Sequence, residues 1–400
     1  MASSVRPLTS LTLEDLWREV KDPRTLWGDI SEETQRRVKF LLENRMNEEV
    51  LHYLRAPRYA RLPGRRGYRN GVYRRQLTTT WGTIPDLEVP RIRHGAFTPA
   101  VLERYQRRTR EVDTLIRRVF LGGVSTRQVG PLLASLLGDR VSPATVSRIT
   151  RTLDRAVQAY HRRPLTDRYR YLLLDGVTLR VKTPDGAKRR TALVAYGITP
   201  EGRRELIDFR LVRTESQATW EAFLTNLACR GLTGAGLQLI TTDGHVGLHA
   251  ALALVYPQVP RQTCWVHVLR NVAQRLRVRD REPCLALARQ IYQAPTREAA
   301  ETRLWRWVAA WKTRAPQAVQ TLLRDWEALL AFYGVPEPDW RRVRTTNAIE
   351  RAFREIRRRV RPMSCFTNLA SCDRITYAVI SGLNNRWGIR SRSRAFTQDS

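Results

Sequence analysis

Three acidic residues in this sequence have the types and positions of metal ligands. Asp175 interrupts the apolar run YLLLDGVTLRV, Asp243 closes the run LQLITTDG, and Glu350 lies near the start of the basic stretch TTNAIERAFREIRRRVRP. Two aspartates on strand-like segments and one glutamate on a helix suit a two-magnesium site for phosphoryl transfer, because Mg²⁺ takes oxygen ligands and keeps water and substrate phosphate in its shell. Two such ions carry four positive charges against three from the carboxylates, which leaves the scissile phosphate to complete the neutralisation.

Each aspartate also has a structural interpretation. Asp175 and Gly176 could form a turn between two shorter strands, since Asp-Gly is a strong hairpin signal. Inside a buried strand, Asp175 would instead need an arginine, hydrogen bonds or a metal to offset the cost of burying its charge. Asp243 could be a loop residue or a helix cap, although ligands of open α/β sheets bind beyond the carboxyl ends of strands, where this residue is expected.

The basic helix contains two glutamates, and helical geometry does not choose between them. Glu350 could form a capping box with Asn347 at the helix start. The apolar stripe of the helix is formed by Ile349, Ala352, Phe353, Ile356 and Val360. Glu350 lies on one flank of this stripe with Arg354 and Arg357, and Glu355 lies on the other flank, roughly 140° away. The two glutamates therefore cannot serve one site together.

The elements that must position these acids follow an α/β order. Three strand candidates, YLLLDGVTLRVK, RRTALVAYGIT and RRELIDFRLVR, are joined by turn-like segments, which predicts an antiparallel meander. A helix (SQATWEAFLTNLACRGL), a strand (LQLITTDG), a helix (GLHAALALVYP) and a short strand (RQTCWVHV) follow. We expect the fourth and fifth strands to flank the first. Residues 270–340 are predicted to be helical and separate these strands from the basic helix.

The N-terminal part of the chain has a different character. Residues 11–56 are predicted to be helical, and residues 57–99 form a basic β-element with two short strands around Trp81 and Gly82. Helical periodicity returns from residue 111, with Ser125 and Ser142-Pro143 at predicted helix starts. The last two helices have the outline of a helix-turn-helix or of a plain helical hairpin. In the first case, the second helix would present to DNA the residues Thr145, Arg148, Thr150 and Arg151.

The charge balance indicates a polyanionic partner. The 400 residues include 70 Lys+Arg against 38 Asp+Glu, for a formal net charge of +32. Arginine binds phosphate oxygens bidentately, and neutralised phosphates release counterions, so a nucleic acid backbone is the expected partner. No run approaches the roughly 20 apolar residues of a membrane span, and the N-terminus has no apolar signal core, so we expect an intracellular protein with no membrane partner. The five cysteines, without any CxxC pair, predict reduced thiols and argue against a disulfide framework or a zinc ribbon.

The chain resembles the transposases of the Mutator superfamily, in particular the bacterial insertion-sequence branch. Eight blocks carry the resemblance in the family's order, and together they span most of the chain. They are RNGVYRRQLTTTWGTIPDLEVPRIRHGAF, FLGGVSTRQV, VSPATVSRI, LLLDGVTLRV, ESQATWEAFLTNLACRGL, TTDGHVGL, CWVHVLRN and TTNAIERAFREIRRR.

The resemblance implies a ribonuclease-H-like mixed-sheet catalytic core at residues 166–269 and 341–400. An all-helical insertion at residues 270–340 would interrupt this core. DNA-binding regions would precede it, a helical and β-element region at residues 1–110 and a helix-turn-helix-like domain at residues 111–165.

The resemblance also implies a catalytic triad of Asp175, Asp243 and Glu350, and it prefers Glu350 to Glu355. Two Mg²⁺ ions would be held there, with Mn²⁺ as a substitute. We expect Asp175 to bridge both ions and the other two carboxylates to hold one each.

Further residues are predicted to contact DNA. The family's Cys-x-x-His motif matches Cys264 and His267, which we interpret as DNA contacts near the cut. A buried pair at a strand end is the alternative, and a single CxxH lacks the four ligands of a zinc site. The other candidates for DNA binding are Arg69, Asn70, Arg148, Arg151, Arg354 and Arg357.

The expected activity is that of a DNA transposase. It would bind the terminal inverted repeats of its insertion sequence as at least a homodimer, cleave a strand end, and use the released 3′-OH to attack double-stranded target DNA. The expected location is the bacterial cytoplasm, in association with the nucleoid. The alternatives are a non-catalytic, domesticated DNA-binding regulator and a structure-specific nuclease or resolvase that lacks strand transfer.

Overall fold

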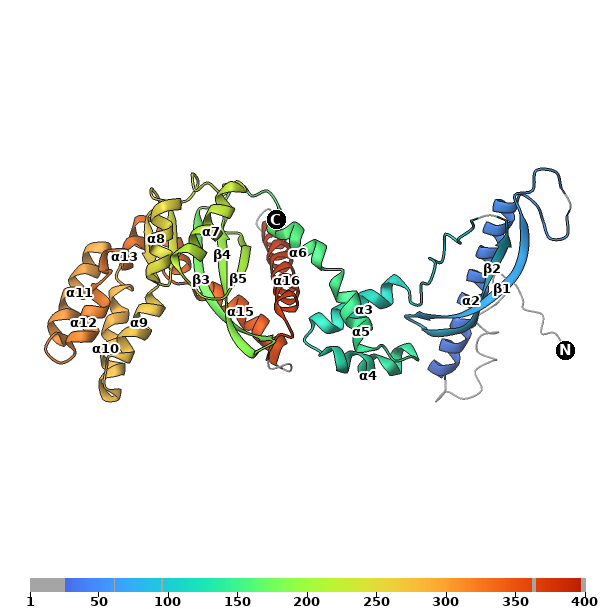
Figure 1. The fold of residues 1–400 in the computed structure, drawn as a ribbon. Helices are drawn as coiled ribbons and strands as arrows, with labels where there is room; N and C mark the ends of the chain where they lie inside the picture. The colour runs from blue at the N-terminus through green and yellow to red at the C-terminus, as the bar shows by residue number, and fades with distance from the viewer. Residues whose placement is uncertain (1–25, 61, 95, 362–364, 397–400) are drawn as a thin grey trace. The chain divides into compact units, whose positions relative to one another are not determined.

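The computed structural model describes residues 26–60, 62–94, 96–361 and 365–396. The chain divides into two compact units, one that ends at Thr150 and one that begins at Arg151. Figure 1 shows the secondary structure elements of both units.

The first unit begins with a long helix packed against a β-hairpin. Helix α2 (Leu26–Leu54) contacts the hairpin of β1 (Tyr68–Thr79) and β2 (Gly82–Arg93). Their shared core is made by Met46, Leu77, Ile84, Leu87, Val89 and Leu102. The two strands predicted around Trp81 and Gly82 are confirmed, as is the helix after residue 25, whereas the part of that helix predicted for residues 11–25 lies outside the described residues.

Three helices complete the first unit. They are α3 (Arg110–Leu121), α4 (Thr126–Leu137) and α5 (Pro143–Arg151). The predicted start of α5 is confirmed, because the Ser142 hydroxyl accepts a hydrogen bond from the Thr145 amide at 3.2 Å. Arg148 and Arg151 are exposed on α5, but Thr150 is only 2% exposed, so its predicted presentation to DNA is wrong. Its position on the helix belongs to the buried face, which Val146 and Ile149 share.

The second unit contains a five-stranded mixed sheet. Its strands are β3 (Tyr171–Thr183), β4 (Gly186–Ile198), β5 (Arg204–Val212), β6 (Leu239–Thr242) and β7 (Arg261–Thr263). The strand order is β5-β4-β3-β6-β7; the first three strands along the chain are antiparallel, and β6 runs parallel to both β3 and β7. The predicted meander is therefore confirmed. Only β6 flanks the first strand, because β4 occupies its other edge, so the fifth strand pairs with β6 instead.

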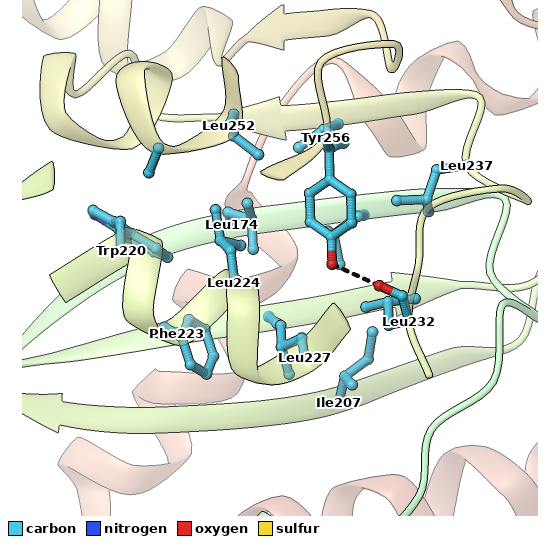
Figure 2. Close-up of a cluster of buried hydrophobic side chains, with 14 of the residues drawn as sticks. Leu174, Ile207, Trp220, Phe223, Leu224, Leu227, Leu232, Leu237, Leu252 and Tyr256 are labelled. Carbon is cyan, nitrogen blue, oxygen red and sulfur yellow. Dashed lines mark hydrogen bonds between the residues drawn. The ribbon is translucent and has the colours of Figure 1, made fainter. Parts of the chain in front are cut away.

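Helices cover both faces of this sheet. On one face, α7 (Gln217–Cys229) and α8 (Val246–Val255) bury an apolar cluster against the strands, as Figure 2 shows. Trp220 and Phe223 come from α7, and Leu174 comes from β3. The other face is covered by α15 (Asn347–Val360) and α16 (Leu369–Phe396). The five residues of the stripe predicted for α15 are all buried there.

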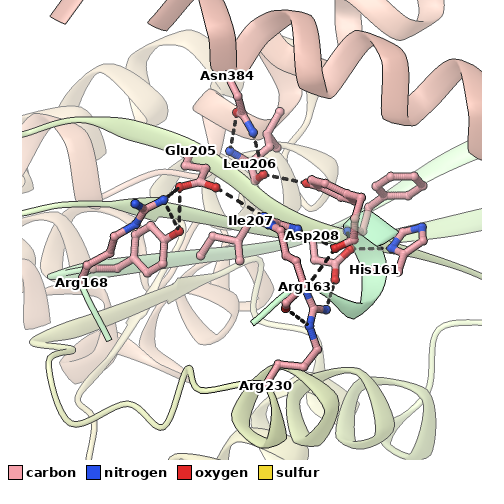
Figure 3. Close-up of polar contacts among 12 residues, drawn as sticks. His161, Arg163, Arg168, Glu205, Leu206, Ile207, Asp208, Arg230 and Asn384 are labelled. Atoms are coloured by element: carbon pink, nitrogen blue, oxygen red, sulfur yellow. Dashed lines mark hydrogen bonds and ion pairs between the residues drawn. The ribbon is translucent and has the colours of Figure 1, made fainter. Parts of the chain in front are cut away.

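A polar network fixes the start of the second unit to the sheet. Helix α6 (Asp154–Arg162) packs on β5 and α16. Figure 3 shows Asp208 of β5 between His161, whose Nδ1 lies 2.7 Å from Oδ1, and Arg230, whose guanidinium donates to Oδ2. Asp208 is only 2% exposed, so its side chain is a buried carboxylate with two side-chain partners and one backbone donor, the Phe209 amide at 2.8 Å.

A block of helices lies between the sheet strands and α15. It consists of α9 (Trp265–Gln274), α10 (Val278–Ile291), α11 (Arg297–Trp311), α12 (Pro316–Leu323), α13 (Trp326–Leu329), η2 (Ala331–Gly334) and α14 (Glu337–Val343). Its tryptophans hold neighbouring segments together, since Trp307 donates to the Cys284 carbonyl at 3.0 Å and Trp265 to the Leu329 carbonyl at 2.8 Å. The predicted helical character of residues 270–340 is confirmed.

Two further predictions concern the whole chain. Each of the five cysteines is free, as predicted. Among the residues that the structure describes, no helix has the length and apolar character needed to cross a membrane.

Candidate active site

Asp175 lies in the middle of β3, not in a turn. The strand continues through it, with Asp175 paired to Val194 and Gly176 paired to Leu193 of β4, which excludes the hairpin-turn interpretation. Asp175 is 4% exposed, and its Oδ2 atom is buried without a hydrogen-bond partner among the described residues. The pKa of Asp175 is raised to about 7, mainly by burial; the nearby carboxylates of Asp243 and Glu350 also act to raise it, whereas His267 acts to lower it.

Asp243 follows the strand next to β3. Since β6 runs parallel to β3 and ends at Thr242, Asp243 emerges at the carboxyl end of this strand. Its Oδ1 accepts a hydrogen bond from the His245 amide at 3.0 Å, which shapes the turn into α8. The side chain is thus part of a loop turn, as the structural interpretation predicted, and it also lies within electrostatic range of Asp175.

Glu350 lies in the first turn of α15 and is held by an arginine of another helix. Arg270 of α9 donates to Oε1 at 2.7 Å and to Oε2 at 3.2 Å, and this pairing lowers the pKa of Glu350. The proposed capping box with Asn347 is wrong, because the cap position is Thr346 and Asn347 is already helical. A guanidinium binds both carboxylate oxygens more strongly than one backbone amide can, so the ion pair prevails.

Glu355 points to a different environment from Glu350. Its carboxylate contacts Arg358 and Arg359 of its own helix, each at 3.0 Å. Glu350, by contrast, is near enough to Asp175 to raise the pKa of that residue. The packing of α15 on β3 therefore distinguishes the two glutamates, because it brings Glu350 within electrostatic range of Asp175.

Cys264 and His267 form a supporting pair beside these acids. Cys264, the cap residue of α9, is fully buried, and its sulfur accepts a hydrogen bond from the Thr346 amide at 3.3 Å. A hydrogen bond to Cys264 raises the pKa of His267 to about 9, and His267 Nε2 lies 3.8 Å from Glu350 Oε1. A side chain with no exposed surface cannot contact DNA directly, so the predicted DNA contact of Cys264 does not fit; its contacts orient the loop before α15 and the imidazole.

The structure distributes the other predicted DNA-binding residues over both units. Arg69, Asn70 and Arg148 lie in the first unit, whereas Arg151, Arg354 and Arg357 lie in the second. Arg69 is half-buried, and its Nε has no hydrogen-bond partner in the described part of the chain; the other five residues are exposed. Arg354 and Arg357 border a groove of about 760 Å³ beside Thr178–Arg180 of β3.

Sequence reasoning missed a basic cleft in the first unit. This cleft has a volume of about 840 Å³ and lies among β1, β2, residues 104–108 and the start of α5. The arginines that line it are Arg74, Arg75, Arg91, Arg104, Arg107, Arg108 and Arg140. The recurring arginine pairs in the sequence were the available signal, but only the fold brings these separate segments to one concave surface.

Asp175, Asp243 and Glu350 are suitable metal ligands by type, but their carboxylates are not gathered around a single position. In the part of the chain that the structure describes, no group of three His, Cys, Asp or Glu side chains is gathered closely enough to hold an ion. Glu350 would have to turn from Arg270 toward Asp175 to join such a group. The unpartnered oxygen of Asp175 fits a cation, because a buried carboxylate oxygen with no donor lacks the compensation that burial requires.

A comparison with protein families identifies the chain. The model of the Mutator family of transposases matches residues 12–390. The chain belongs to this family. Its relatives include the transposase for insertion sequence element ISRM5 of Rhizobium meliloti, which is 32% identical over 88% of this chain and 87% of the relative.

Other Mutator transposases give similar values. The transposase for IS256 in transposon Tn4001 of Staphylococcus aureus is 32% identical over 88% of this chain and 89% of its own. The transposase for insertion sequence element IS1201 of Lactobacillus helveticus is 34% identical over 86% of this chain and 91% of the relative. Among solved structures, one match is a chain of the simian T-cell lymphotropic virus intasome in complex with PP2A regulatory subunit B56 gamma. The match covers 52% of this transposase and 64% of the intasome chain, at 12% sequence identity. Its TM-score of 0.17 is too low to support a fold assignment.

Proposed function

We propose that this transposase binds the terminal inverted repeats of its insertion sequence, cleaves a DNA strand at the element end and transfers the 3′-OH to target DNA. The observation that carries the catalytic part is Asp175, a buried carboxylate with one unpartnered oxygen and with Asp243 and Glu350 in its electrostatic environment. A buried carboxylate whose pKa is strongly shifted by burial and by neighbouring charges is typical of catalytic sites.

The catalytic core is proposed to be ribonuclease-H-like. The order β5-β4-β3-β6-β7, with three antiparallel strands followed by two parallel ones, supports this assignment. Asp175 on the central strand and Asp243 after its parallel neighbour then face the same end of the sheet.

Asp175, Asp243 and Glu350 are the residues that would hold two Mg²⁺ ions, with Mn²⁺ as a substitute. Asp175 would contribute to both ions, and the other two carboxylates to one each. When bound, the pair supplies Lewis acids for the attacking and leaving oxygens of an in-line displacement at phosphorus.

The cationic residues around the acids would bind the phosphates of the DNA backbone. His267, whose pKa is about 9, is protonated at neutral pH and can donate a hydrogen bond to a phosphate oxygen. Arg354 and Arg357 are exposed along the flank of α15 that carries Glu350, where they can bind the DNA backbone on either side of the scissile phosphate.

The first unit is proposed to bind the element ends. The basic cleft offers seven arginines with Asp139 as the acid in its lining, and the exposed Arg148 lies on the helix whose start borders this cleft. Arginine side chains of this density neutralise several phosphates at once. Because two ends must be held together for transposition, we expect at least a homodimer in the synaptic complex.

An assay with defined repeat DNA tests this proposal. Asp175→Asn, Asp243→Asn and Glu350→Gln should each abolish strand cleavage in Mg²⁺ or Mn²⁺ while DNA binding survives. Glu355→Gln is the matched control, because it removes a carboxylate from the same helix outside the site, and it should cleave normally. Cleavage at the wild-type rate by any of the first three variants would refute the catalytic assignment, and cleavage without joined product on supercoiled target would indicate a nuclease.

A further inference from the structure

A fourth carboxylate approaches the acids from the other side of β3. Glu215 lies between β5 and α7, directly before Ser216, which caps α7. A Cβ atom placed on Gly176 would lie 2.5 Å from Glu215 Oε2 and 2.9 Å from Oε1. The carboxylate of Glu215 therefore packs on the backbone of β3 at the residue after Asp175, and this close approach explains why position 176 is a glycine.

The position of the Glu215 carboxylate is fixed by one specific hydrogen bond. Trp220 donates from its indole nitrogen to Oε1 at 2.8 Å. Trp220 is fully buried in the apolar cluster of Figure 2, so its indole cannot move freely. The capping box between Ser216 and Thr219 fixes the chain on the other side of the carboxylate. No described residue donates to Oε2, which leaves that oxygen available.

The edge of β3 is open where Glu215 and Asp175 lie. The pairing of β6 with β3 extends from Tyr171 to Leu173 and stops there, and Asp243 turns away just beyond. Successive residues of a strand point to opposite faces, so Asp175 and the residue at 176 face opposite sides of the sheet. Asp243 follows β6 directly after its pairing with β3 ends, and it lies within electrostatic range of both Asp175 and Glu215.

This arrangement is unfavourable for the protein alone. Three partly or fully buried carboxylates lie near the part of β3 that contains Asp175 and Gly176, and one oxygen of Asp175 has no partner among the described residues. A glutamine at position 215 would accept the same hydrogen bond from Trp220 without the like-charge repulsion. A cation between the carboxylates would remove both costs.

We propose that Glu215 is a fourth carboxylate of the metal site, acting through Oε2 on the ion held by Asp243. This assignment rests on the proposed metal-dependent function. Trp220 is a positioning residue in this scheme, because it orients the Glu215 carboxylate without touching the ion itself.

Mn²⁺ binding to the full chain without DNA tests the proposal separately from catalysis. Glu215→Gln should lower Mn²⁺ affinity, measured by electron paramagnetic resonance or calorimetry, by about tenfold or more. Trp220→Phe should cause a smaller loss, because the carboxylate remains but is no longer oriented. Glu221→Gln on the same helix is the matched control and should bind Mn²⁺ like the wild type.

The outcomes separate this proposal from the function on which it rests. If Asp243→Asn loses Mn²⁺ and Glu215→Gln binds it with wild-type affinity, the role of Glu215 is overturned and the metal-dependent function stands. If the wild-type chain itself binds no Mn²⁺, the proposed function fails. Fe²⁺-dependent hydroxyl-radical cleavage of the wild-type chain provides a readout that needs no variant. We expect backbone cuts near residues 175, 215 and 243, and cuts that omit residue 215 would overturn the assignment.

Discussion

The substitution Asp175→Asn should stabilise the metal-free protein at alkaline pH while it destroys activity. Asp175 has a pKa of about 7 in the folded chain, against an ordinary value of 3.8. At about 1.4 kcal/mol per pH unit, this difference corresponds to a penalty of about 4 kcal/mol for ionising the buried carboxyl. The residue is only 4% exposed, so solvent screening reduces this penalty little.

The sign of the pH dependence follows from proton binding. Between pH 4 and 7 the folded chain keeps the proton of Asp175 and the unfolded chain has lost it, so this group lowers the free energy of unfolding as the pH rises. Below pH 4 both states are protonated and the penalty is absent. Asparagine does not titrate, so the stability difference between variant and wild type should grow by about 4 kcal/mol from pH 4 to pH 8.

Urea unfolding followed by tryptophan fluorescence measures this difference, since Trp220 and Trp265 are buried in the second unit. Any packing change caused by the amide is the same at both pH values and cancels. Asp208→Asn is the matched control, because Asp208 is a buried carboxylate with His161 and Arg230 as partners. It should lose about 3 kcal/mol at pH 8, since it leaves Arg230 without its counter-charge.

Two results would refute this reasoning. A stability difference that does not change between pH 4 and pH 8 would mean that Asp175 is ionised without penalty. A loss of stability at pH 8 would mean that the metal-free chain provides a partner for its charge. Added Mg²⁺ should stabilise the wild type at pH 8 more than the variant, because binding to the folded state alone raises its stability.

Three further predictions concern the surroundings of the acids and the DNA surface. Arg270→Met frees Glu350 and should lower the Mn²⁺ concentration needed for half-saturation by at most about fivefold, because a partly exposed ion pair contributes at most about 1 kcal/mol; a higher requirement would show that Arg270 supports metal binding. Arg148→Ala should weaken binding to element-end DNA and reduce the salt slope measured by fluorescence anisotropy by about 0.9, whereas unchanged affinity would remove α5 from the DNA interface. Gly176→Ala should displace Glu215, cost about 1–3 kcal/mol in urea unfolding and weaken Mn²⁺ binding, and full retention of both would contradict the close packing described above.

Local patterns were sufficient to predict most of the elements. Apolar alternation and turn residues predicted the β1–β2 hairpin and the antiparallel meander, and the apolar stripe of α15 was read correctly from its period. These features depend on residues close together in the chain, so their physical cause is present in the sequence. The fifth strand was placed wrongly, because the edge at which a strand pairs depends on which edges are already occupied.

For the candidate active site, too, some features follow from the sequence and others only from the tertiary structure. The sequence by itself determined that Asp175, Asp243 and Glu350 are candidate metal ligands in strand-like and helical surroundings, and that the chain has the charge to bind DNA. Only the tertiary structure decided that Glu350 and not Glu355 lies beside Asp175, that Arg270 holds Glu350, and that Glu215 packs on Gly176. Helical and strand periods fix the direction of a side chain relative to its own element, whereas the distance between side chains from distant segments depends on how those elements pack.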